Sequence, residues 1–199
     1  MNLNRRNLLG VIATGATCLA APKAFAAVRT TERPALLDRA LAALDTHGAQ
    51  PIERDILGIV DFTVHSSKQR FQIVDIASGR VRSTYLVAHG KGSDPRHTGW
   101  VQSLSNRPGS NSSSEGSYLT GQAYFGKHGR SRRLHGLDAC NSHAYDRAIV
   151  MHGADYVSPN LIDEYGKIGR SLGCFAVEQH VRDEVLDLLG PNRLLFAAG

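Results

Sequence analysis

The side chains best suited to covalent chemistry in this sequence are a histidine and, later in the chain, a cysteine. His152 ends the apolar run RAIVMHG, and Cys174 lies in the glycine-rich run GRSLGC. The segment between them can fold back and place thiol and imidazole side by side. A thiol has a reference pKa of ~8.5, and an adjacent imidazole can stabilise the thiolate, which is the attacking species. The pair therefore predicts nucleophilic attack by Cys174, with His152 as the base.

Gly173 and the order of the two residues extend this prediction. Because glycine lacks a Cβ atom, the amides around Cys174 can turn toward the negative oxygen that develops on an attacked carbonyl, which is typically worth ~3 to 4 kcal/mol per donor. Papain-like enzymes have the cysteine first and the histidine later. Here the one histidine after Cys174 is His180, which falls in a predicted helix. The order indicates a different family of thiol enzymes.

The first 26 residues have the features of an export signal. Arg5 and Arg6 form a positive start, residues 8–21 are apolar, and Ala24-Phe25-Ala26 is a cleavage pattern. The apolar run is shorter than the ~18 residues needed to span a bilayer, which argues against stable membrane insertion. We therefore expect a periplasmic protein. The twin arginine leaves two export routes open, the twin-arginine route and ordinary secretion.

Three other interpretations of Cys174 stay open at this level. In an exported protein it can form a disulfide with Cys140. It can also be a buried, inert thiol. A zinc site is the third interpretation, although the sequence lacks the paired Cys-x-x-Cys that makes zinc sites recognisable. The residues of ligand type are His135, Cys140, His143, His152 and Cys174.

The charge of the mature chain argues against a nucleic-acid partner. The formal net charge is +5, and loss of three cations (Arg5, Arg6, Lys23) with the predicted signal lowers it to +2. No stripe of Lys and Arg interleaved with aromatic residues is present. The basic run KHGRSRR at residues 127–133 is expected to be a solvated loop. A patch that attracts carboxylate-rich ligands is the alternative.

The N-terminal half of the mature chain changes its hydrophobic period near Ile56. Before it, residues 33–48 carry leucines on one face, with Pro34 at the start and Gly48 at the end, which predicts an amphipathic helix. After it, short β-branched and aromatic runs predict strands of an antiparallel sheet. We therefore divide the chain into an export signal (1–26), a helical extension (27–55) and a catalytic domain (56–199).

The second half of the chain predicts further strands around a long loop. Residues 90–118 have a composition typical of disorder, but a loop of this length inside a compact domain is often functional. The later elements are expected as strands at 118–126, 147–153, 174–177 and 192–199 and a helix at 178–190.

Several separate blocks of the chain resemble, in the same order, the L,D-transpeptidases of the YkuD type. They lie within residues 56–177 and include VDFTVHSSKQRFQIVDIASGRV, LVAHGKGSD, DRAIVMHGADYV and GRSLGCFAV. The branch they resemble is described as murein L,D-transpeptidase catalytic domain proteins. The resemblance implies a mainly β, mixed sandwich-like catalytic domain with an N-terminal helix and a few short helices. It also implies an exported location and peptidoglycan stem peptides as substrates.

The resemblance assigns roles to residues around the pair. It implies that Cys174 is the nucleophile and His152 the base that activates it. Gly153 takes the place of the third member, which orients the imidazole through its backbone carbonyl. Ser171 and Gly173 match the serine and glycine of the family signature.

The sequence departs from that signature at two places. Leu172 stands where the signature has a histidine, and Phe175-Ala176 replaces its usual ending. Leucine cannot donate a hydrogen bond, so any contact that the histidine makes with the oxyanion or the substrate must come from elsewhere. We expect Tyr124, Tyr118 or Arg170 to provide it.

The activity implied by the resemblance is a two-step acyl transfer. A thioester on Cys174 would pass a donor stem peptide to the amine of an acceptor stem peptide, in a 3-3 or a 1-3 cross-link. If water replaces the acceptor, the same thiol makes an L,D-carboxypeptidase or endopeptidase. A non-catalytic cell-wall-binding module is a further alternative. We expect carbapenem-type β-lactams to inactivate the enzyme, and we expect neither a cofactor nor a metal.

Overall fold

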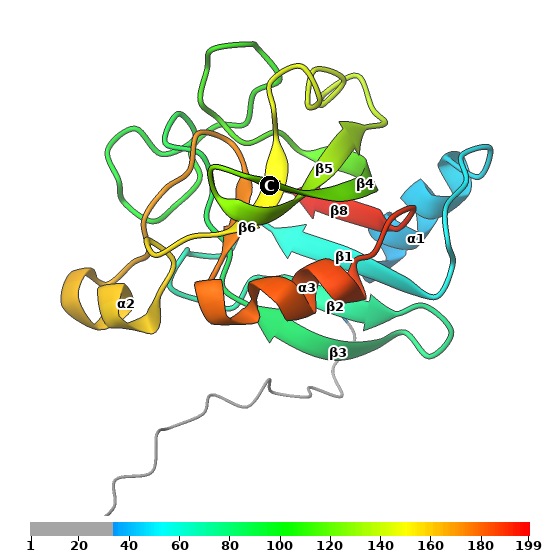
Figure 1. Cartoon of the computed structure of the whole chain (residues 1–199), viewed down its shortest axis with the longest axis horizontal. Helices are drawn as coiled ribbons and strands as arrows, with labels where there is room; N and C mark the ends of the chain where they lie inside the picture. The colour runs from blue at the N-terminus through cyan, green and yellow to red at the C-terminus, as the bar shows by residue number, and fades with distance from the viewer. Residues whose placement is uncertain (1–33) are drawn as a thin grey trace, which may run out of the picture.

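The structure of the protein, a computed structural model, describes residues 34–199. The predicted export signal at 1–26 and the first residues of the predicted extension lie outside this part of the chain. Eight strands form one sheet, and short helices lie around it (Figure 1). The strands are β1 (Ile56–Asp61), β2 (Phe71–Asp75), β3 (Arg80–Tyr85), β4 (Gly116–Gly126), β5 (Gly129–Gly136), β6 (Val150–Gly153), β7 (Phe175–Val177) and β8 (Leu194–Ala198). The helices are α1 (Leu37–Thr46), α2 (Pro159–Tyr165), the 3-10 helix η1 (Gln179–Val181) and α3 (Arg182–Leu188).

The sheet mixes antiparallel and parallel neighbours. Its strand order is β3-β2-β1-β8-β4-β5-β6-β7. Most neighbours are antiparallel, but β8 runs parallel to β1, and β7 runs parallel to β6. Parallel neighbours need a crossover connection rather than a tight hairpin. The crossover between β6 and β7 contains α2 and the glycine-rich run that carries Cys174.

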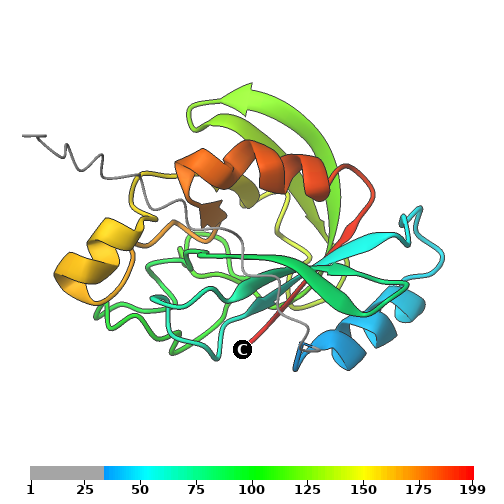
Figure 2. The ribbon, with the colours of Figure 1, turned by 90° about the horizontal axis from the view of Figure 1, so that it is seen from below.

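The two central strands β1 and β8 are buried on both faces, which explains their nearly continuous apolar sequences. On one face, Leu57, Ile59 and Phe196 pack against α1 together with Leu37 and Leu44 of that helix. On the other face, apolar residues of the same strands pack against α3. Figure 2 shows the two helices on opposite sides of the sheet. The helix at the N-terminal end of the described chain is thus part of the same packed body.

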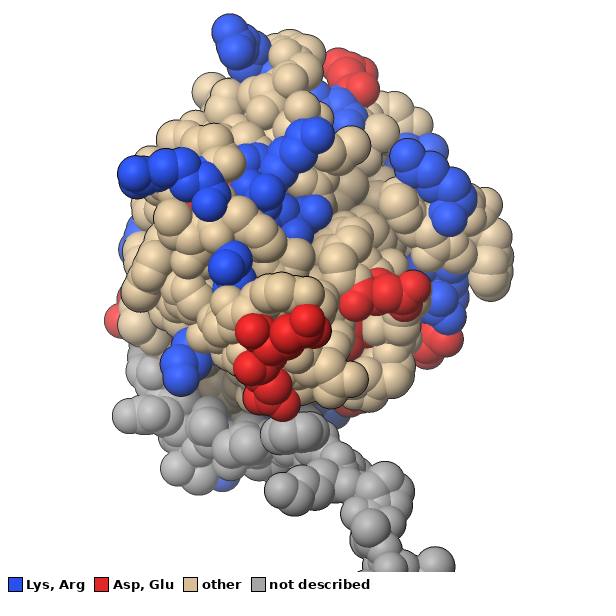
Figure 3. All heavy atoms as spheres, turned by 90° about the vertical axis from the view of Figure 1, so that its left-hand side faces the viewer, with Lys and Arg blue, Asp and Glu red and all other residues tan. Residues whose placement is uncertain are grey.

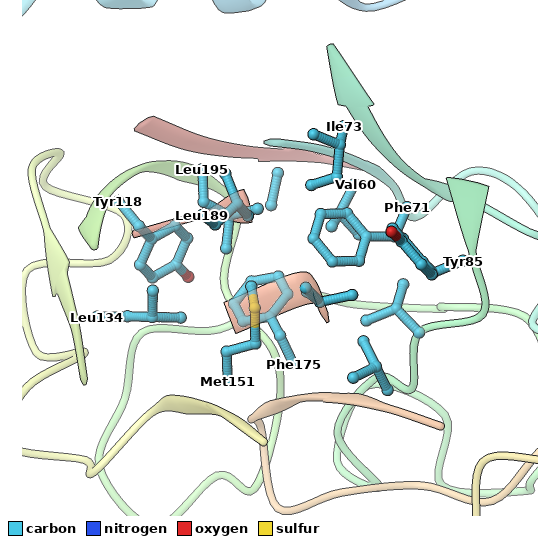
Figure 4. Close-up of a cluster of buried hydrophobic side chains, with 14 of the residues drawn as sticks. Val60, Phe71, Ile73, Tyr85, Tyr118, Leu134, Met151, Phe175, Leu189 and Leu195 are labelled. Atoms are coloured by element: carbon cyan, nitrogen blue, oxygen red, sulfur yellow. The ribbon is translucent and has the colours of Figure 1, made fainter. Parts of the chain in front are cut away.

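The main core lies inside the bend of the sheet. Large apolar side chains from both ends of the strand order meet there, among them Phe71 and Tyr85 from one end and Met151 and Phe175 from the other (Figure 4). Gly58 of β1 leaves room for this packing, because a Cβ atom there would come within 2.9 Å of Leu189 Cδ1. The core therefore joins the strands that carry the candidate site to the rest of the sheet.

The bend nearly brings the two ends of the sheet together. The chain that continues from β3 runs beside the chain that leads into β7. The amide of Ala88 donates to the carbonyl of Ala176 at 2.9 Å, and the amide of Ser171 donates to the carbonyl of His89 at 2.9 Å. Gly90 and Ser171 form an isolated parallel bridge. The segment just before Cys174 is therefore held by backbone hydrogen bonds from the opposite end of the sheet.

Helix α2 is positioned by local sequence signals at both ends. Ser158 caps its first turn by accepting a hydrogen bond from the amide of Asn160 at 3.1 Å, and Pro159 follows at the first helical position. At the other end, Gly166 adopts the left-handed conformation (φ 73°) that commonly ends a helix. The crossover between the two site strands therefore has a defined, ordered path.

The predicted fold class is confirmed: the protein is mainly β, with an N-terminal helix and short helices. The predicted antiparallel pairing of the strands after Ile56 is confirmed by β1, β2 and β3. Two local predictions were wrong. Residues 129–133 belong to strand β5 rather than to a solvated loop, and Arg132 in that strand is buried. The predicted helix at 178–190 is divided into η1 and α3.

Within residues 34–199, none of the helices has the length and apolar character required to cross a bilayer.

Candidate active site

Strand β6 carries His152, and Cys174 comes just before the neighbouring strand β7. The parallel register pairs His152 with Ala176, two residues after Cys174. Side chains two residues apart on a strand share a face. The two residues that the sequence singled out therefore lie on adjacent parts of the sheet.

The imidazole of His152 is buried and held by its own strand. Its Nδ1 lies 2.9 Å from the carbonyl oxygen of Gly153. A carbonyl only accepts, so Nδ1 carries the proton and the lone pair of neutral His152 is on Nε2. Burial lowers the pKa of His152 below its usual value, and the charges of His128 and Lys127 lower it further, against the opposing effect of Gly153. At neutral pH, His152 is therefore an uncharged base.

The thiol of Cys174 is partly exposed, and in this structure its hydrogen-bond acceptor is the carbonyl of Ala148, at 3.6 Å from Sγ. Among the described residues, no hydrogen bond joins Sγ to His152. Burial raises the pKa of Cys174, while a backbone hydrogen bond from Val150 and the charges of Lys127 and Arg147 lower it in part. At neutral pH, Cys174 is therefore a thiol and His152 a neutral imidazole in this structure.

Ser171 and Gly173 brace the turn before Cys174. Ser171 Oγ donates to the carbonyl of Cys174 at 2.7 Å and accepts from the amide of Gly173 at 3.0 Å. Gly173 has a φ of 116°, and a Cβ atom there would come within 2.7 Å of the carbonyl oxygen of Ser112. Only glycine fits this position. Because the Gly173 amide is already bonded to Ser171, the expectation that it points toward an oxyanion is wrong for this state.

The three residues expected to replace the missing signature histidine lie in different surroundings. Tyr118 is fully buried and its hydroxyl hydrogen-bonds to Ser114, so the prediction that it contacts substrate is wrong. Arg170 donates to the backbone carbonyl of Asp94. The ring of Tyr124 lies 4.4 Å below the guanidinium of Arg133 on the β4–β5 hairpin. Leu172 itself is 56% exposed, beside the thiol in sequence.

Two residues that the sequence did not emphasise lie close to the pair. The ring of His128, from the turn between β4 and β5, stacks on the ring of His152 with centroids 4.2 Å apart. Arg147 donates to the carbonyls of Ser105 and Ser112 and acts electrostatically on Cys174. A hairpin reading of residues 118–136 would have placed His128 at a turn, but no local pattern indicates which residue that turn faces.

A cavity of about 430 Å³ lies on the His152 side of the pair. It is lined by the β4–β5 turn, by the chain after β6, and by Gln179 and Arg182. Lys127 and Asp155 bring opposite charges to it. On the face of the molecule that carries α2, basic side chains gather in the upper part and acidic side chains in the lower part (Figure 3). A ligand that crosses this face meets both signs of charge.

The other interpretations of the cysteines can be compared with the geometry. Cys140 and Cys174 are both free thiols, and Cys140 Sγ donates to the carbonyl of Glu115 at 3.3 Å. His135 stacks on Tyr145. The part of the chain that the structure describes contains no cluster of three or more His, Cys, Asp or Glu side chains that could hold a metal. The geometry therefore supports neither a bridge nor a zinc site around Cys174.

A buried charged cluster lies under the chain segment that precedes Cys174. Arg70 donates to His89 Nδ1 at 2.7 Å and to the carbonyls of Val64 and Val87. The other ring nitrogen of His89 lies 3.4 Å from Asp94. Asp94 in turn accepts from the amides of Thr98 and Gly99 within the long loop. His89 is thus a core residue that helps to order residues 90–118.

Solved structures with a similar fold have low sequence identity to this chain. A variant of the helical cell shape determining protein Pgp2 from Campylobacter jejuni is 11% identical, with a TM-score of 0.50 over 79% of this chain and 53% of that one. An L,D-transpeptidase from Mycobacterium smegmatis is 12% identical, with a TM-score of 0.45 over 73% and 59%. L,D-transpeptidase 3 from Mycobacterium tuberculosis, in complex with a faropenem-derived adduct, is 11% identical, with a TM-score of 0.46 over 73% and 60%.

At these identities the likeness concerns the fold alone. The chain spans about three fifths of the length of the two mycobacterial proteins. No curated protein matches it. The model of the L,D-transpeptidase catalytic domain family, YkuD_2, matches residues 29–198, which include α1 and all eight strands. The resemblance first seen in the sequence is thereby confirmed. The chain belongs to the L,D-transpeptidase catalytic domain family.

Proposed function

We propose that this protein is a peptidoglycan L,D-transpeptidase that joins two stem peptides through a thioester on Cys174. Membership of the family supports acyl transfer as the reaction class. The observation that carries the assignment of roles is the state of His152, whose Nδ1 is bound to Gly153 so that its basic Nε2 is available on the strand beside Cys174. The general base and the nucleophile thus come from neighbouring strands, as this chemistry requires.

The first step forms the thioester. A rotation about the Cα–Cβ bond moves the Cys174 sulfur from the Ala148 carbonyl toward His152. Nε2 of His152 accepts the thiol proton while sulfur attacks the carbonyl carbon of an L-residue in the donor stem. The tetrahedral intermediate collapses, the carbon–nitrogen bond breaks, and the imidazolium returns the proton to the leaving D-amino acid amine. Because both groups start neutral, proton transfer accompanies the attack and is not complete before it.

The second step transfers the acyl group. An acceptor amine attacks the thioester carbon, and His152 accepts the proton that this nitrogen loses. The carbon–sulfur bond then breaks, and the proton returns to Cys174 as the thiol leaves. The product is an amide cross-link, in the 3-3 register when the donor carbonyl belongs to the third stem residue and in the 1-3 register when it belongs to the first. The same groups act in both steps.

A mass-spectrometric experiment tests the proposal. Purified protein incubated with a tetrapeptide muropeptide should gain an acyl mass on the peptide that contains Cys174, and dimers should accumulate. Cys140→Ala is a matched control, because it removes the other free thiol of the described chain. It should retain the adduct, and Cys174→Ala should lose it. An adduct that persists in Cys174→Ala, or none in the wild type, would contradict the proposal.

A β-lactam adduct provides a second, substrate-independent readout. One protein of similar fold, L,D-transpeptidase 3 from Mycobacterium tuberculosis, has been solved with a faropenem-derived adduct. We propose that a carbapenem likewise acylates Cys174 here, since its strained amide presents a carbonyl carbon to the same thiol. The expected result is a stoichiometric mass increase in the wild type and in Cys140→Ala. The absence of any increase at high carbapenem concentration would argue against a reactive nucleophile.

Hydrolysis is the second candidate activity. Water in place of the acceptor amine would release the thioester as a carboxylic acid, with His152 accepting the proton that the water loses. The products of the muropeptide digest separate the two activities. Cross-linked dimers identify a transpeptidase, and shortened monomers alone identify an L,D-carboxypeptidase or endopeptidase. If neither product forms while muropeptide still binds, the protein is a non-catalytic wall-binding module.

The location of the protein is part of the proposal. The features of residues 1–26 support export to the periplasm, where peptidoglycan stems are found. N-terminal sequencing of protein recovered from a periplasmic extract should begin at Ala27. Recovery from the cytosol with Met1 intact would contradict this prediction. Replacement of Arg5 and Arg6 by lysine should block export if the twin-arginine route is used and should spare it otherwise.

A further inference from the structure

His128 lies directly over the imidazole proposed as the base. It belongs to the short turn between β4 and β5, next to Lys127 and between Gly126 and Gly129. Its ring is nearly parallel to that of His152, with an interplanar angle of 20° and a centroid separation of 4.2 Å. The edge of the His152 ring is fixed by Gly153. One imidazole is therefore held at its edge by a carbonyl and covered on one face by a second imidazole.

The charges around this stack come from several elements. Lys127 is on the same turn as His128, and Arg182 of α3 lines the same cavity. Arg182 also lies close to the backbone of Gly153. Asp155, from the chain after β6, brings a negative charge to that cavity, and Arg182 is paired with Asp183 at 3.0 Å. The charge of Lys127 acts on both rings and adds to the repulsion that a second proton on the stack would meet.

We propose that His128 is a positioning residue for the reaction assigned above: it holds the His152 ring in plane and, because two stacked cations repel, restricts the pair to one proton at a time. This keeps His152 in its basic form at pH values at which an isolated imidazole would begin to be protonated. The role of His128 in catalysis rests on the proposed function. The electrostatic coupling between the two imidazole rings does not depend on it.

The direction of the electrostatic effects agrees with this geometry. Burial lowers the pKa of His128, and Lys127 lowers it further. For His152, burial is the largest effect, and the charge of His128 is among those that add to it. Sites that interact in this way titrate as a pair. Removal of the charge on one ring should therefore change the titration of the other.

An NMR titration of the His152 ring tests the coupling directly. His128→Phe keeps a flat ring over His152 but cannot carry a proton, so the pKa of His152 should rise while the fold is unchanged. Lys127→Gln is the matched control on the same turn. It removes one charge but leaves the stack, and it should give a smaller rise. An unchanged His152 titration in His128→Phe would overturn the proposal.

The alkylation rate of Cys174 by iodoacetamide gives a second readout that needs no cell-wall substrate. A higher pKa of His152 leaves less of the base at pH 6, so His128→Phe should react more slowly than the wild type at pH 6, by up to about fourfold, and equally fast at pH 8. A loss of equal size at both pH values would indicate displacement of the ring only and would also overturn the proposal. Both proteins carry Cys140→Ala, so that alkylation of Cys140 does not contribute to the measured rate.

These tests separate the two proposals. If the titration shifts but no muropeptide product forms, the ring coupling stands and the transpeptidase assignment fails. If cross-links form and the titration does not shift, the enzyme stands and the role of His128 is lost.

Discussion

Two histidines of this protein are buried to the same degree and have opposite environments. His89 and His152 are each 1% exposed. His89 accepts from the guanidinium of Arg70 through Nδ1 and faces Asp94 through its other nitrogen. His152 is tied through Nδ1 to a backbone carbonyl, and among residues 34–199 its Nε2 has no hydrogen-bond partner. Both nitrogens of the first ring are occupied, and one nitrogen of the second is available.

The difference shows that the partners of a buried histidine, and not its burial, decide whether it can take part in proton transfer. Burial and the charge of Arg70 lower the pKa of His89 to about 4, and the ring is locked in one tautomer because a guanidinium only donates. Burial also lowers the pKa of His152, but its carbonyl partner leaves a lone pair for the substrate side. The first histidine is structural, and the second is the candidate base.

The two regions are also connected. The carbonyl of His89 accepts the amide of Ser171, whose hydroxyl braces the turn at Cys174. Arg70 is buried, and burial lowers its pKa to about 9, so it stays a cation at neutral pH. The buried cluster thus anchors the segment that carries Cys174. The comparison predicts that mutations in the cluster change stability, whereas mutations at His152 change rate.

His152→Ala should have the largest effect on rate. Loss of a general base typically costs ~10² to 10⁴-fold, so carbapenem acylation of Cys174 should slow by that factor. The midpoint of urea unfolding should fall less than in a variant of the buried charged cluster, because His152→Ala loses the hydrogen bond to Gly153 and the ring contact with His128 but leaves no buried charge without its partner. Stopped-flow fluorescence or mass spectrometry measures the rate. An acylation rate equal to that of the wild type would remove His152 as the base.

Arg70→Met should have the largest effect on stability. It leaves two buried carbonyls and His89 without their donor and Asp94 without its nearby cation. Removal of one partner from a buried ionic cluster typically costs ~3 to 5 kcal/mol. Urea unfolding at pH 7.5 measures the free energy of unfolding. Arg70→Lys, which keeps the charge but not the planar set of donors, should lose less. Equal stability of Arg70→Met and wild type would show that the cluster contributes nothing.

The pH dependence of stability should depend on His89. Since its folded pKa of about 4 lies below the unfolded value of ~6.5, the unfolded chain takes up a proton that the folded chain excludes. The free energy of unfolding should therefore fall as pH drops below ~6.5, by about 2 kcal/mol at pH 5. His89→Gln should remove this part of the slope. Carboxylates with lowered pKa, such as Asp94, act in the same direction, so the difference between wild type and variant is the quantity to measure.

Ser171→Ala should have the smallest effect, and it should change both the stability of the protein and the rate of acylation. It removes the hydrogen bonds of one hydroxyl to the Gly173 amide and the Cys174 carbonyl. A net cost of about 1 to 2 kcal/mol in unfolding free energy is expected, together with a modest slowing of acylation as the turn loosens. Ser171→Thr, which keeps the hydroxyl, should retain more of both. A stable variant with unchanged acylation would show that the turn is held by Gly173 and the backbone alone.

Local sequence patterns predicted the helices and strands whose apolar residues repeat at the period of that element. The leucine spacing of residues 33–48 predicted α1, and the β-branched runs predicted β1, β2 and β3, because an element with a buried face repeats its apolar residues at a fixed period. Strand β5 was missed because its basic residues hide the pattern. The guanidinium of Arg132 is buried in that strand and bonded to backbone carbonyls, which composition cannot indicate.

The sequence by itself predicted the candidate pair, Cys174 and His152, because a thiol and an imidazole in a recognisable order carry their reactivity in their side chains. It also determined the mainly β class of the fold. Only the tertiary structure decided that Tyr118 belongs to the core, that the Gly173 amide is bonded to Ser171, and that His128 covers His152. These facts depend on contacts between segments far apart in the chain, and such contacts exist only once the sheet has bent and closed around its core.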